Sequence, residues 1–398
     1  MEKIVAVIEI STKAIKFLAG YEIKGKPYVL YSLNKKIGPL SNVGKITDMP
    51  RIIEEIKKMS DIQDVSAHIH IKFSEAILIV PPFGLQVLEG KRSSLINSDN
   101  GIISNADIRS LYSSFRRGKL PENYSLIDIV PDSFKLENEE TKEPPIGKYS
   151  NSIELTAKLH CIPQSIYSDY KNAMDTTKLS LKRSFVAPFA AVQALANYKD
   201  IPSSYILVDI GSDLTTVTLV ANEKIFCSRF FSWGGDKIND SLIEKFNISY
   251  DDAEKYKCLY GYDTRKVSFK APICTLIDED GVESKIYKDD FNAVIKSQLD
   301  SFTNSLNSAL NSLLEGYQSD IKRLPMVLIG GGSCLVGLKE YIEHKIPSDV
   351  VIHKISDTIG VRNSSFFNCL GAIIADSKYK NVYDENHPKI NQVTRNPK

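Results

Sequence analysis

Two segments of the sequence share a design that could bind phosphate. Residues 7–12 (VIEIST) and 208–213 (VDIGSD) each precede a second apolar run. Each predicts a buried strand that ends in a carboxylate, Glu9 or Asp209, then a tight turn of small residues and another strand. Such a hairpin presents backbone N–H groups and hydroxyls to phosphate oxygens, while its carboxylate reaches a magnesium ion through water. Taken singly, either segment is only a hairpin with a polar tip.

A third segment of interest is a run of glycines. Residues 327–333 (VLIGGGS) predict an apolar strand that enters three glycines, followed by a helix from about residue 336. Glycines let the backbone lie flat against a base or ribose, and a helix N-terminus favours anions. The alternative is a loose connection, although three glycines are costly in backbone entropy. No GxxxxGK[ST] motif is present, which excludes a P-loop.

The bulk composition limits the possible functions. A chain of 398 residues exceeds what one core holds, so we expect at least two domains. The 50 basic and 49 acidic residues exclude a typical nucleic-acid-binding protein. Six scattered cysteines without a CxxC pair predict buried free thiols in a reducing cytoplasm. The N-terminus shows no signal peptide, and no apolar run is long enough to span a bilayer, so we expect a cytosolic protein.

The order of the expected elements is typical of an α/β protein. Before residue 82 we expect a helix at 51–59 among strands at 4–8, 15–21, 28–33, 67–73 and 76–80. Polar residues and turn formers dominate from 81 to 101, and a capping-box pattern at 104–107 then opens a helix. Later elements are expected as strands at 125–130, 153–161 and 205–210 and helices at 166–181 and 290–314. The apolar stripe of the last helix predicts a core-facing side.

Two phosphate hairpins followed by a glycine-rich strand resemble the superfamily of actin, sugar kinases and heat-shock protein 70. Within it, the sequence is most similar to the bacterial cell-division family FtsA. Residues 129–131 (IVP), 145–147 (PIG) and 157–160 (AKLH) resemble the "IPQ…NPxG…AxxH" run of FtsA subdomain 1C. Residues 231–235 (FSWGG) and 366–371 also look like the family. The pilus protein PilM shares this layout and is the nearest alternative.

The resemblance implies an actin-like fold, in which two duplicated α/β domains surround a nucleotide cleft and an FtsA-type subdomain 1C is inserted. The expected limits are 1–82, 162–185 and 360–380 for subdomain 1A, 83–161 for subdomain 1C, 186–236 and 306–359 for subdomain 2A, 237–305 for subdomain 2B, and 381–398 for a disordered tail. The tail is polar, and the C-terminal amphipathic membrane helix of the family is not visible in it.

The resemblance also implies ATP and Mg²⁺ as ligands. The metal would be held through water by Glu9 and Asp209. The phosphates would be held by Ser11, Thr12, Lys16, Gly211, Ser212 and Asp213, and the adenosine by Gly330, Gly331 and Gly332 with Glu254 and Lys257 on one helix face. Gly235, in the FSWGG segment, completes the expected nucleotide contacts.

Some positions depart from the family pattern. Glu9 replaces the more common Asp, Ser11 stands where most relatives have Gly, and Ser212 and Leu214 break the usual "GGGT". In MreB-like relatives a Glu that orients the attacking water precedes the matching proline, and here that position is Ala187. We therefore assign no catalytic residue and expect at most slow ATP hydrolysis.

The family implies a filament-forming adaptor at the cytoplasmic face of the membrane at the division site. Expected partners are other copies of the chain through subdomain 1C, the FtsZ C-terminal tail through subdomain 2B, and the membrane surface, but no nucleic acid. The basic residues expected to flank the tail site are Arg265, Lys266, Lys270, Lys285 and Lys288. A PilM-like scaffold of pilus assembly remains open, as does a small-molecule kinase, although no catalytic carboxylate for an acceptor is evident near the hairpins.

Overall fold

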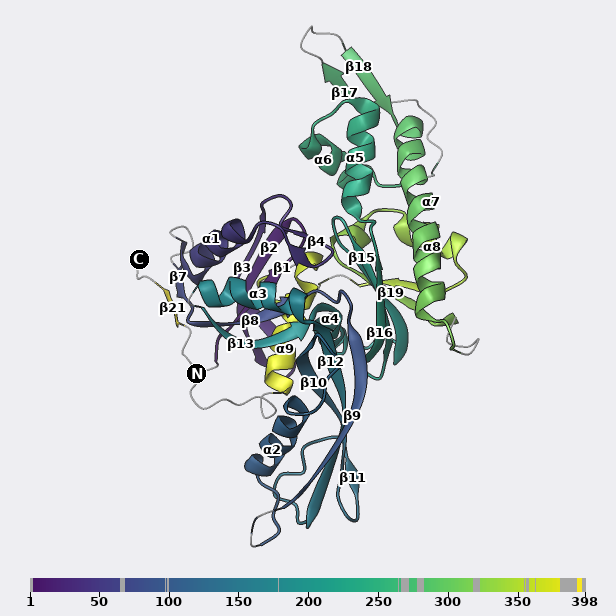
Figure 1. Cartoon of the computed structure of the whole chain (residues 1–398). Helices are drawn as coiled ribbons and strands as arrows, with labels where there is room; N and C mark the ends of the chain where they lie inside the picture. Colours follow the sequence, from purple (N-terminus) through teal and green to yellow (C-terminus); the bar gives the residue numbers. More distant parts are fainter. Residues whose placement is uncertain are drawn as a thin grey trace.

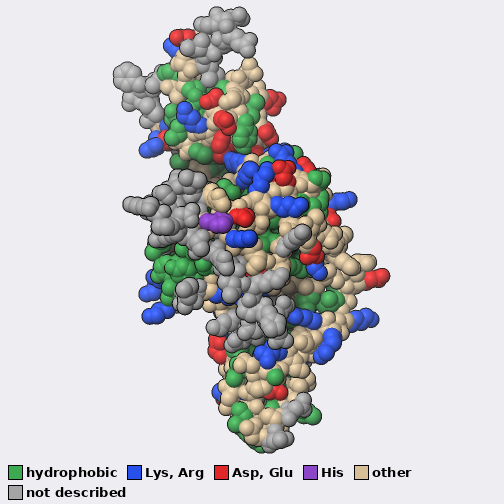
Figure 2. All heavy atoms as spheres, turned by 90° about the vertical axis from the view of Figure 1, so that its left-hand side faces the viewer, with side chains coloured by type: hydrophobic (Ala, Val, Ile, Leu, Met, Phe, Trp, Pro, Cys, Tyr) green, Lys and Arg blue, Asp and Glu red, His purple; other side chains and the backbone are tan. Residues whose placement is uncertain are grey.

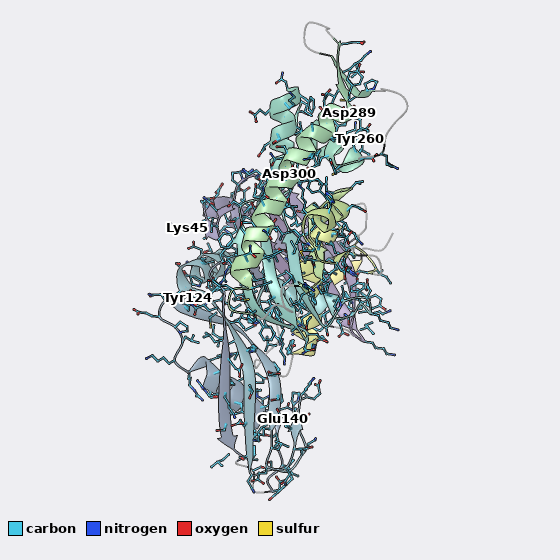
Figure 3. All side chains as sticks on the ribbon, turned by 90° about the vertical axis from the view of Figure 1, so that its right-hand side faces the viewer. Lys45, Tyr124, Glu140, Tyr260, Asp289 and Asp300 are labelled. Atoms are coloured by element: carbon cyan, nitrogen blue, oxygen red, sulfur yellow. The ribbon has the colours of Figure 1, made fainter. Side chains whose placement is uncertain are left out.

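The computed structural model describes residues 3–64, 69–96, 98, 100–177, 179–263, 265, 272–277, 283–317, 323–353, 355, 358–361, 363–379 and 392–395. Two sheet-based halves lie side by side, and a lobe extends from each in opposite directions (Figure 1). In the side view of Figure 3, Tyr260 and Asp289 mark one lobe and Glu140 marks the other.

The first half is built on a five-stranded sheet with the order β13-β8-β1-β2-β3. Its strands are β1 (Val5–Ile10), β2 (Ala14–Ile23), β3 (Lys26–Lys36), β8 (Glu75–Val80) and β13 (Ser180–Val186). All residues of β1 and β8 are buried, as expected for strands covered on both faces. The helices that pack on this half are α1 (Met49–Ser60), α3 (Gln164–Thr176), α4 (Ala187–Leu195) and α9 (Phe367–Lys378).

The second half repeats this plan with a sheet of order β16-β15-β14-β19-β20. Its strands are β14 (Ser204–Ile210), β15 (Thr215–Ala221), β16 (Lys224–Phe231), β19 (Met326–Ile329) and β20 (Val350–Ile352). In both halves an antiparallel hairpin is flanked by a parallel strand: β1–β2 by β8, and β14–β15 by β19. The duplicated arrangement confirms the predicted actin-like plan of two related α/β halves.

Helix α7 (Lys288–Leu313) covers the second sheet and continues into the upper lobe of Figure 1. Its predicted apolar stripe is a core face, because Phe291, Ile295, Leu299, Phe302 and Leu306 are all buried. The other elements of this half are α5 (Gly235–Phe246), α6 (Tyr250–Tyr260), β17 (Pro272–Ile277), β18 (Glu283–Tyr287), the 3₁₀ turn η2 (Gly331–Cys334) and α8 (Leu338–Lys345).

The opposite lobe consists of a four-stranded antiparallel sheet with one helix. Its elements are β9 (Gln86–Leu95), α2 (Asn105–Arg116), β10 (Tyr124–Lys135), β11 (Glu140–Thr141) and β12 (Ser152–Pro163). The lobe has its own core, to which Ile108, Tyr112 and Phe134 contribute. The predicted capping box is confirmed: Ser104 accepts from the Asp107 N–H, and the Asp107 carboxylate accepts from the Ser104 N–H.

Several expectations were wrong in detail. The helix expected at 166–181 ends at Thr176, because the chain then enters the first sheet as β13, parallel to β8. The stretch 81–101, expected to be polar turns, contains the ten-residue strand β9. The helix expected from about residue 336 starts at Leu338, after η2. The strand expected at 67–73 is β7 (Ile69–Lys72); residues 65–68 lie outside the described residues.

The prediction of a disordered tail was wrong for Gln392–Arg395, which form strand β21. This strand pairs with β7, which also pairs with β6 (Asp61–Asp64). The other tail residues lie outside the described part of the chain. A further short hairpin joins β4 (Ser41–Asn42) to β5 (Lys45–Ile46).

Basic and acidic side chains are interspersed over the face shown in Figure 2, in keeping with the nearly neutral charge. Among the described residues, no helix combines the length and apolar character needed to cross a bilayer. All six cysteines are free, as predicted, but only Cys161 and Cys369 are buried as expected. Cys227 and Cys274 are half-buried, and Cys258 and Cys334 are exposed.

Candidate nucleotide-binding cleft

The two predicted phosphate hairpins have the same turn geometry. The Ser11 N–H donates to the Ala14 carbonyl at 2.9 Å, and the Gly211 N–H donates to the Leu214 carbonyl at 2.9 Å. Equivalent residues are 200 positions apart, as in 11 and 211, or 9 and 209. These two N–H groups close their own turns, so phosphate contacts fall to the other N–H groups and the hydroxyls of the tips.

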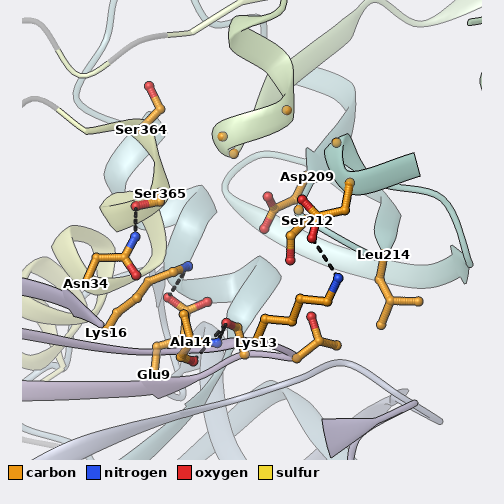
Figure 4. Close-up of a pocket in the computed structure, with 18 of the residues that line it drawn as sticks. Glu9, Lys13, Ala14, Lys16, Asn34, Asp209, Ser212, Leu214, Ser364 and Ser365 are labelled. Carbon is orange, nitrogen blue, oxygen red and sulfur yellow. Dashed lines mark hydrogen bonds and ion pairs between the residues drawn. The ribbon is translucent and has the colours of Figure 1, made fainter. Parts of the chain in front are cut away.

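Both hairpins, the glycine turn and α6 line one cavity of about 910 Å³ (Figure 4). This volume is within the range of small-molecule sites. The predicted site residues on its wall are Glu9, Ser11, Thr12, Lys16, Asp209, Gly211, Ser212, Gly235, Glu254, Lys257, Gly330, Gly331 and Gly332. Asp213 does not line the cavity; its carboxylate pairs instead with Lys13 at 2.7 Å. The structure therefore does not support the phosphate contact expected of Asp213.

The two hairpin carboxylates face each other across the cleft and share a hydrogen-bond donor. Asn368 Nδ2, from α9, lies 2.9 Å from Glu9 Oε1 and 3.5 Å from Asp209 Oδ2. Burial raises the pKa of Asp209; the Lys16 charge opposes this rise, and the Glu9 charge adds to it. Two close carboxylates attract a cation, and Mg²⁺ typically takes one or two protein carboxylates together with phosphates and waters. The donor set therefore fits a nucleotide-bound Mg²⁺.

Lys16 lies opposite Glu9 in the first hairpin, and its Nζ is 3.1 Å from Glu9 Oε2. Burial lowers the pKa of Lys16, but the negative charges of Glu9 and Asp209 raise it more, so its pKa is above the ordinary lysine value. The side chain is therefore a permanent cation at the wall of the cavity, where an anionic group of a ligand would be stabilised.

Helix α6, which also lines the cavity, carries the predicted ion pair. Lys257 Nζ is 2.5 Å from Glu254 Oε2 and donates to the Gly235 carbonyl at 3.1 Å. Asn239 Nδ2 also donates to Glu254 Oε2, at 2.7 Å. Burial alone would raise the pKa of Glu254, but its bonds with Lys257 and Asn239 lower it below the ordinary value. The two side chains share a helix face, as their spacing predicts.

The three glycines after β19 have different roles. Gly330 has a φ of +85°, and a Cβ there would lie 2.4 Å from Asp209 Oδ1. A Cβ on Gly332 would lie 2.3 Å from Ile210 Cγ2. These two glycines are therefore required by the second hairpin itself. A Cβ on Gly331 would have no neighbour within 4 Å, so only this position faces open space in the cleft.

Two buried polar atoms on the cavity wall indicate a polar ligand. Trp233 is 4% exposed and Asn368 is 5% exposed, and both line the cavity. Trp233 Nε1 and Asn368 Oδ1 have no hydrogen-bond partner within the described part of the chain. Because buried polar groups are nearly always satisfied, a ligand or its bound water is a natural partner for them.

Sequence reasoning missed several cavity residues. Lys13 bridges the cleft to Asp213 and Asp236, each at 2.7 Å, and Asp236 also accepts from the Tyr250 hydroxyl at 3.0 Å. Asn368 lies in the family-like segment 366–371 but was not assigned a role. The one available signal was the opposite charge of Lys13 and Asp213 at equivalent hairpin positions.

The comparisons with known proteins agree with this geometry. A family model described as "Cell division protein FtsA" matches residues 206–371. The FtsA of Enterococcus hirae is 21% identical over 94% of this chain and 84% of its own length. The FtsA of Streptococcus pneumoniae is 21% identical over 90% of this chain and 77% of its own length. The FtsA of Bacillus subtilis is 19% identical over 83% of this chain and 74% of its own length.

Solved structures show the same fold. The chain is similar to the PilM–PilN type IV pilus biogenesis complex with a TM-score of 0.60 and 16% identity, covering 95% of this chain and 98% of the other. The structure of MreB 5 of Spiroplasma citri bound to AMPPNP is similar with a TM-score of 0.54 and 14% identity, covering 95% of this chain and 97% of the other. The mixed α/β actin-like fold is thereby confirmed. The chain is thus similar to FtsA cell division proteins over most of its length, at 19–21% identity.

Proposed function

We propose that this chain binds ATP with Mg²⁺ between its twin hairpins and works as a filament-forming adaptor in cell division. The observation that carries the proposal is the convergence of both hairpins, the glycine turn and the α6 ion pair on one cavity. Solved structures of MreB 5 from Spiroplasma citri bound to AMPPNP and to ADP, which share the fold, support a nucleotide as the ligand.

Each cavity residue has a role in this proposal. Thr12 and Ser212, at the tips of the two hairpins, would donate hydroxyl hydrogen bonds to phosphates, and Lys16 would contribute a positive charge. Glu9 and Asp209 would hold Mg²⁺ through water, and the ion would neutralise the phosphates. The adenosine would lie against Gly331 and next to the Glu254–Lys257 pair.

Hydrolysis would be slow in this site. Ala187 is the first residue of α4 and lines the cavity, and it offers no group to orient a water. Loss of such positioning costs on the order of a hundredfold or more in rate. ATP would then act mainly as a structural ligand that stabilises the closed cleft and the polymer.

The lobe of residues 83–161 would be subdomain 1C and would make the filament contact. It protrudes from the body (Figure 1). It exposes several large apolar side chains, Leu95, Ile102, Ile146 and Tyr149. Leu95 is 71% exposed, and an apolar patch that includes it would be of the kind that marks protein interaction sites. Replacing Leu95 and Tyr149 by Glu should abolish filaments under the electron microscope without affecting ATP binding. Persistent filaments would place the contact elsewhere.

The lobe formed by α6, β17 and β18 would be subdomain 2B and would take the FtsZ C-terminal tail. Leu259 and Tyr260 are exposed on α6 and could form the apolar part of the site. Its basic part is weaker than expected, because Arg265 and Lys288 both pair with Asp263, at 2.9 and 3.0 Å. Lys285 is exposed, and Lys266 and Lys270 lie outside the described residues. Replacing Leu259 by Glu should therefore weaken tail binding more than replacing Arg265.

Tethering of the division ring to the membrane is the last part of the proposal. The family implies peripheral attachment at the cytoplasmic face, and residues 381–398 offer no apolar stripe for it. Liposome flotation tests this part of the proposal, and a chain that stays unbound would show that tethering needs a further segment or partner.

A PilM-like scaffold of pilus assembly is the second candidate, favoured by the TM-score of 0.60 to the PilM–PilN complex. Co-sedimentation with FtsZ, with and without ATP, separates the two. An FtsA-like adaptor should pellet with FtsZ filaments, and more so with ATP. A chain that binds ATP but stays in the supernatant at every FtsZ concentration would contradict the division role and favour the scaffold. A phosphotransfer assay on small molecules tests the third candidate, a kinase.

A further inference from the structure

The tips of the two hairpins carry opposite charges at equivalent positions. Lys13 extends from the first hairpin towards the second half (Figure 4). Its Nζ lies 2.7 Å from Asp213 Oδ1, at the tip of the second hairpin, and 2.7 Å from Asp236 Oδ2, at the start of α5. One lysine therefore joins two separate elements of the opposite half across the cleft.

The acceptor side of this bridge is held in place by its own hydrogen bonds. The Asp236 side chain is 7% exposed, and its Oδ1 accepts from the Tyr250 hydroxyl at 3.0 Å and from Asn239 Nδ2 at 3.4 Å. The Asp236 N–H donates to the Ser212 carbonyl at 2.8 Å, which ties α5 to the second hairpin. Lys13 thus binds a preorganised acidic site rather than a mobile surface carboxylate.

We propose that Lys13, Asp213 and Asp236 form a latch that holds the two halves of the cleft together before a nucleotide binds. The three side chains lie where the two hairpin tips meet, so a widening of the cleft at this end separates Lys13 from both carboxylates. The pKa of Lys13 supports a permanent charge: partial burial lowers it, but the bonds with Asp213 and Asp236 raise it above the ordinary lysine value.

The latch acts at a different place from two other ion pairs that the second half makes with the rest of the chain. Lys224 pairs with Asp132 on β10, and Lys378 pairs with Glu223 at 2.6 Å, so both of these bonds involve the β15–β16 turn. Lys13 alone among these lysines lines the cavity. If the cleft binds ATP, as proposed above, a phosphate that enters between the hairpins competes with Asp213 and Asp236 for Lys13.

Hydrogen exchange of the nucleotide-free chain tests the latch. Lys13→Gln removes the charge, and exchange at residues 11–14 and 211–214 should then accelerate by roughly fivefold, the effect of losing a half-exposed ion pair. The control is Lys58→Gln, because Lys58 also pairs with two carboxylates, Glu54 and Glu55, but within one helix. Wild-type exchange in Lys13→Gln would overturn the proposal.

A charge swap shows whether faster exchange comes from loss of the Lys13–Asp213 bond or from a general loss of stability. Lys13→Asp should open the cleft more than Lys13→Gln, and adding Asp213→Lys should restore much of the protection because the pair is re-formed in reverse. No restoration in the double variant would contradict a direct bond. Exchange of α2, which lies in the distant lobe, should be unchanged in all variants. Since no nucleotide is present, these results do not depend on whether ATP binding is demonstrated.

Discussion

Gly331→Asp tests the position of the nucleotide with little risk to the fold. A Cβ at this position meets no atom within 4 Å, whereas a Cβ at Gly330 or Gly332 meets the second hairpin at 2.4 or 2.3 Å. The new carboxylate therefore enters the cavity itself. The new carboxylate would repel the negatively charged phosphates of ATP. At a separation of about 8 Å and an effective dielectric constant of about 20, two such unit charges repel by about 2 kcal/mol. We therefore expect the affinity for ATP to fall at least about tenfold, about 1.4 kcal/mol.

Titration with a fluorescent ATP analogue measures this change, and quenching of Trp233, the one tryptophan of the chain, offers a second signal from the cavity wall. Gly331→Ala is the matched control, because it adds the Cβ without the charge and should reduce affinity much less. The free energy of unfolding without nucleotide should stay within about 1 kcal/mol of the wild type for both variants. Unchanged ATP affinity in a folded Gly331→Asp variant would refute the placement of the nucleotide.

Three further predictions follow from the cleft and its surroundings. Ala187→Glu should raise ATP turnover, by up to roughly a hundredfold, and a phosphate-release assay that shows no increase would contradict the role given to this position. Gly371→Ala should destabilise the fold by about 1–3 kcal/mol in urea unfolding, because its Cβ would lie 1.7 Å from the Ala190 carbonyl oxygen; an unchanged midpoint would contradict it. ATP with Mg²⁺ should slow alkylation of Cys258 and Cys334, which line the cavity and are exposed. Cys161 should stay unreactive at neutral pH, because burial and the Asp128 charge raise its pKa to about 11. If Cys258 and Cys334 are alkylated at equal rates with and without ATP and Mg²⁺, the nucleotide binds elsewhere.

The parts of the fold that sequence reasoning predicted have strong local signals. The runs around Glu9 and Asp209 are continuous apolar strands broken by small residues, and the stripe of α7 repeats over many turns. By contrast, β9 is an edge strand with no fully buried residue, so its sequence resembles a polar connection. Strand β13 begins soon after α3 ends, and its sequence resembles a continuation of that helix. Only its pairing with β8, which the sequence does not reveal, shows that it is a strand.

The candidate site was predictable where it depends on single hairpins and unpredictable where it depends on their meeting. Lys16 was expected from the family resemblance of the first hairpin alone, and it lies opposite Glu9 within that hairpin. The bond from Lys13 to Asp213 joins residues 200 positions apart, 13 and 213, and only the three-dimensional arrangement brings them together. Asp213, which this bond holds, does not line the cavity as expected.

The most direct test of the account is a crystal structure of the chain with AMPPNP and Mg²⁺. The triphosphate should lie between the tips of the two hairpins, with the metal next to Glu9 and Asp209 and the adenosine against Gly331. A nucleotide bound outside this cavity, or a cavity that stays empty at saturating AMPPNP, would contradict the claim that the twin hairpins form a nucleotide site.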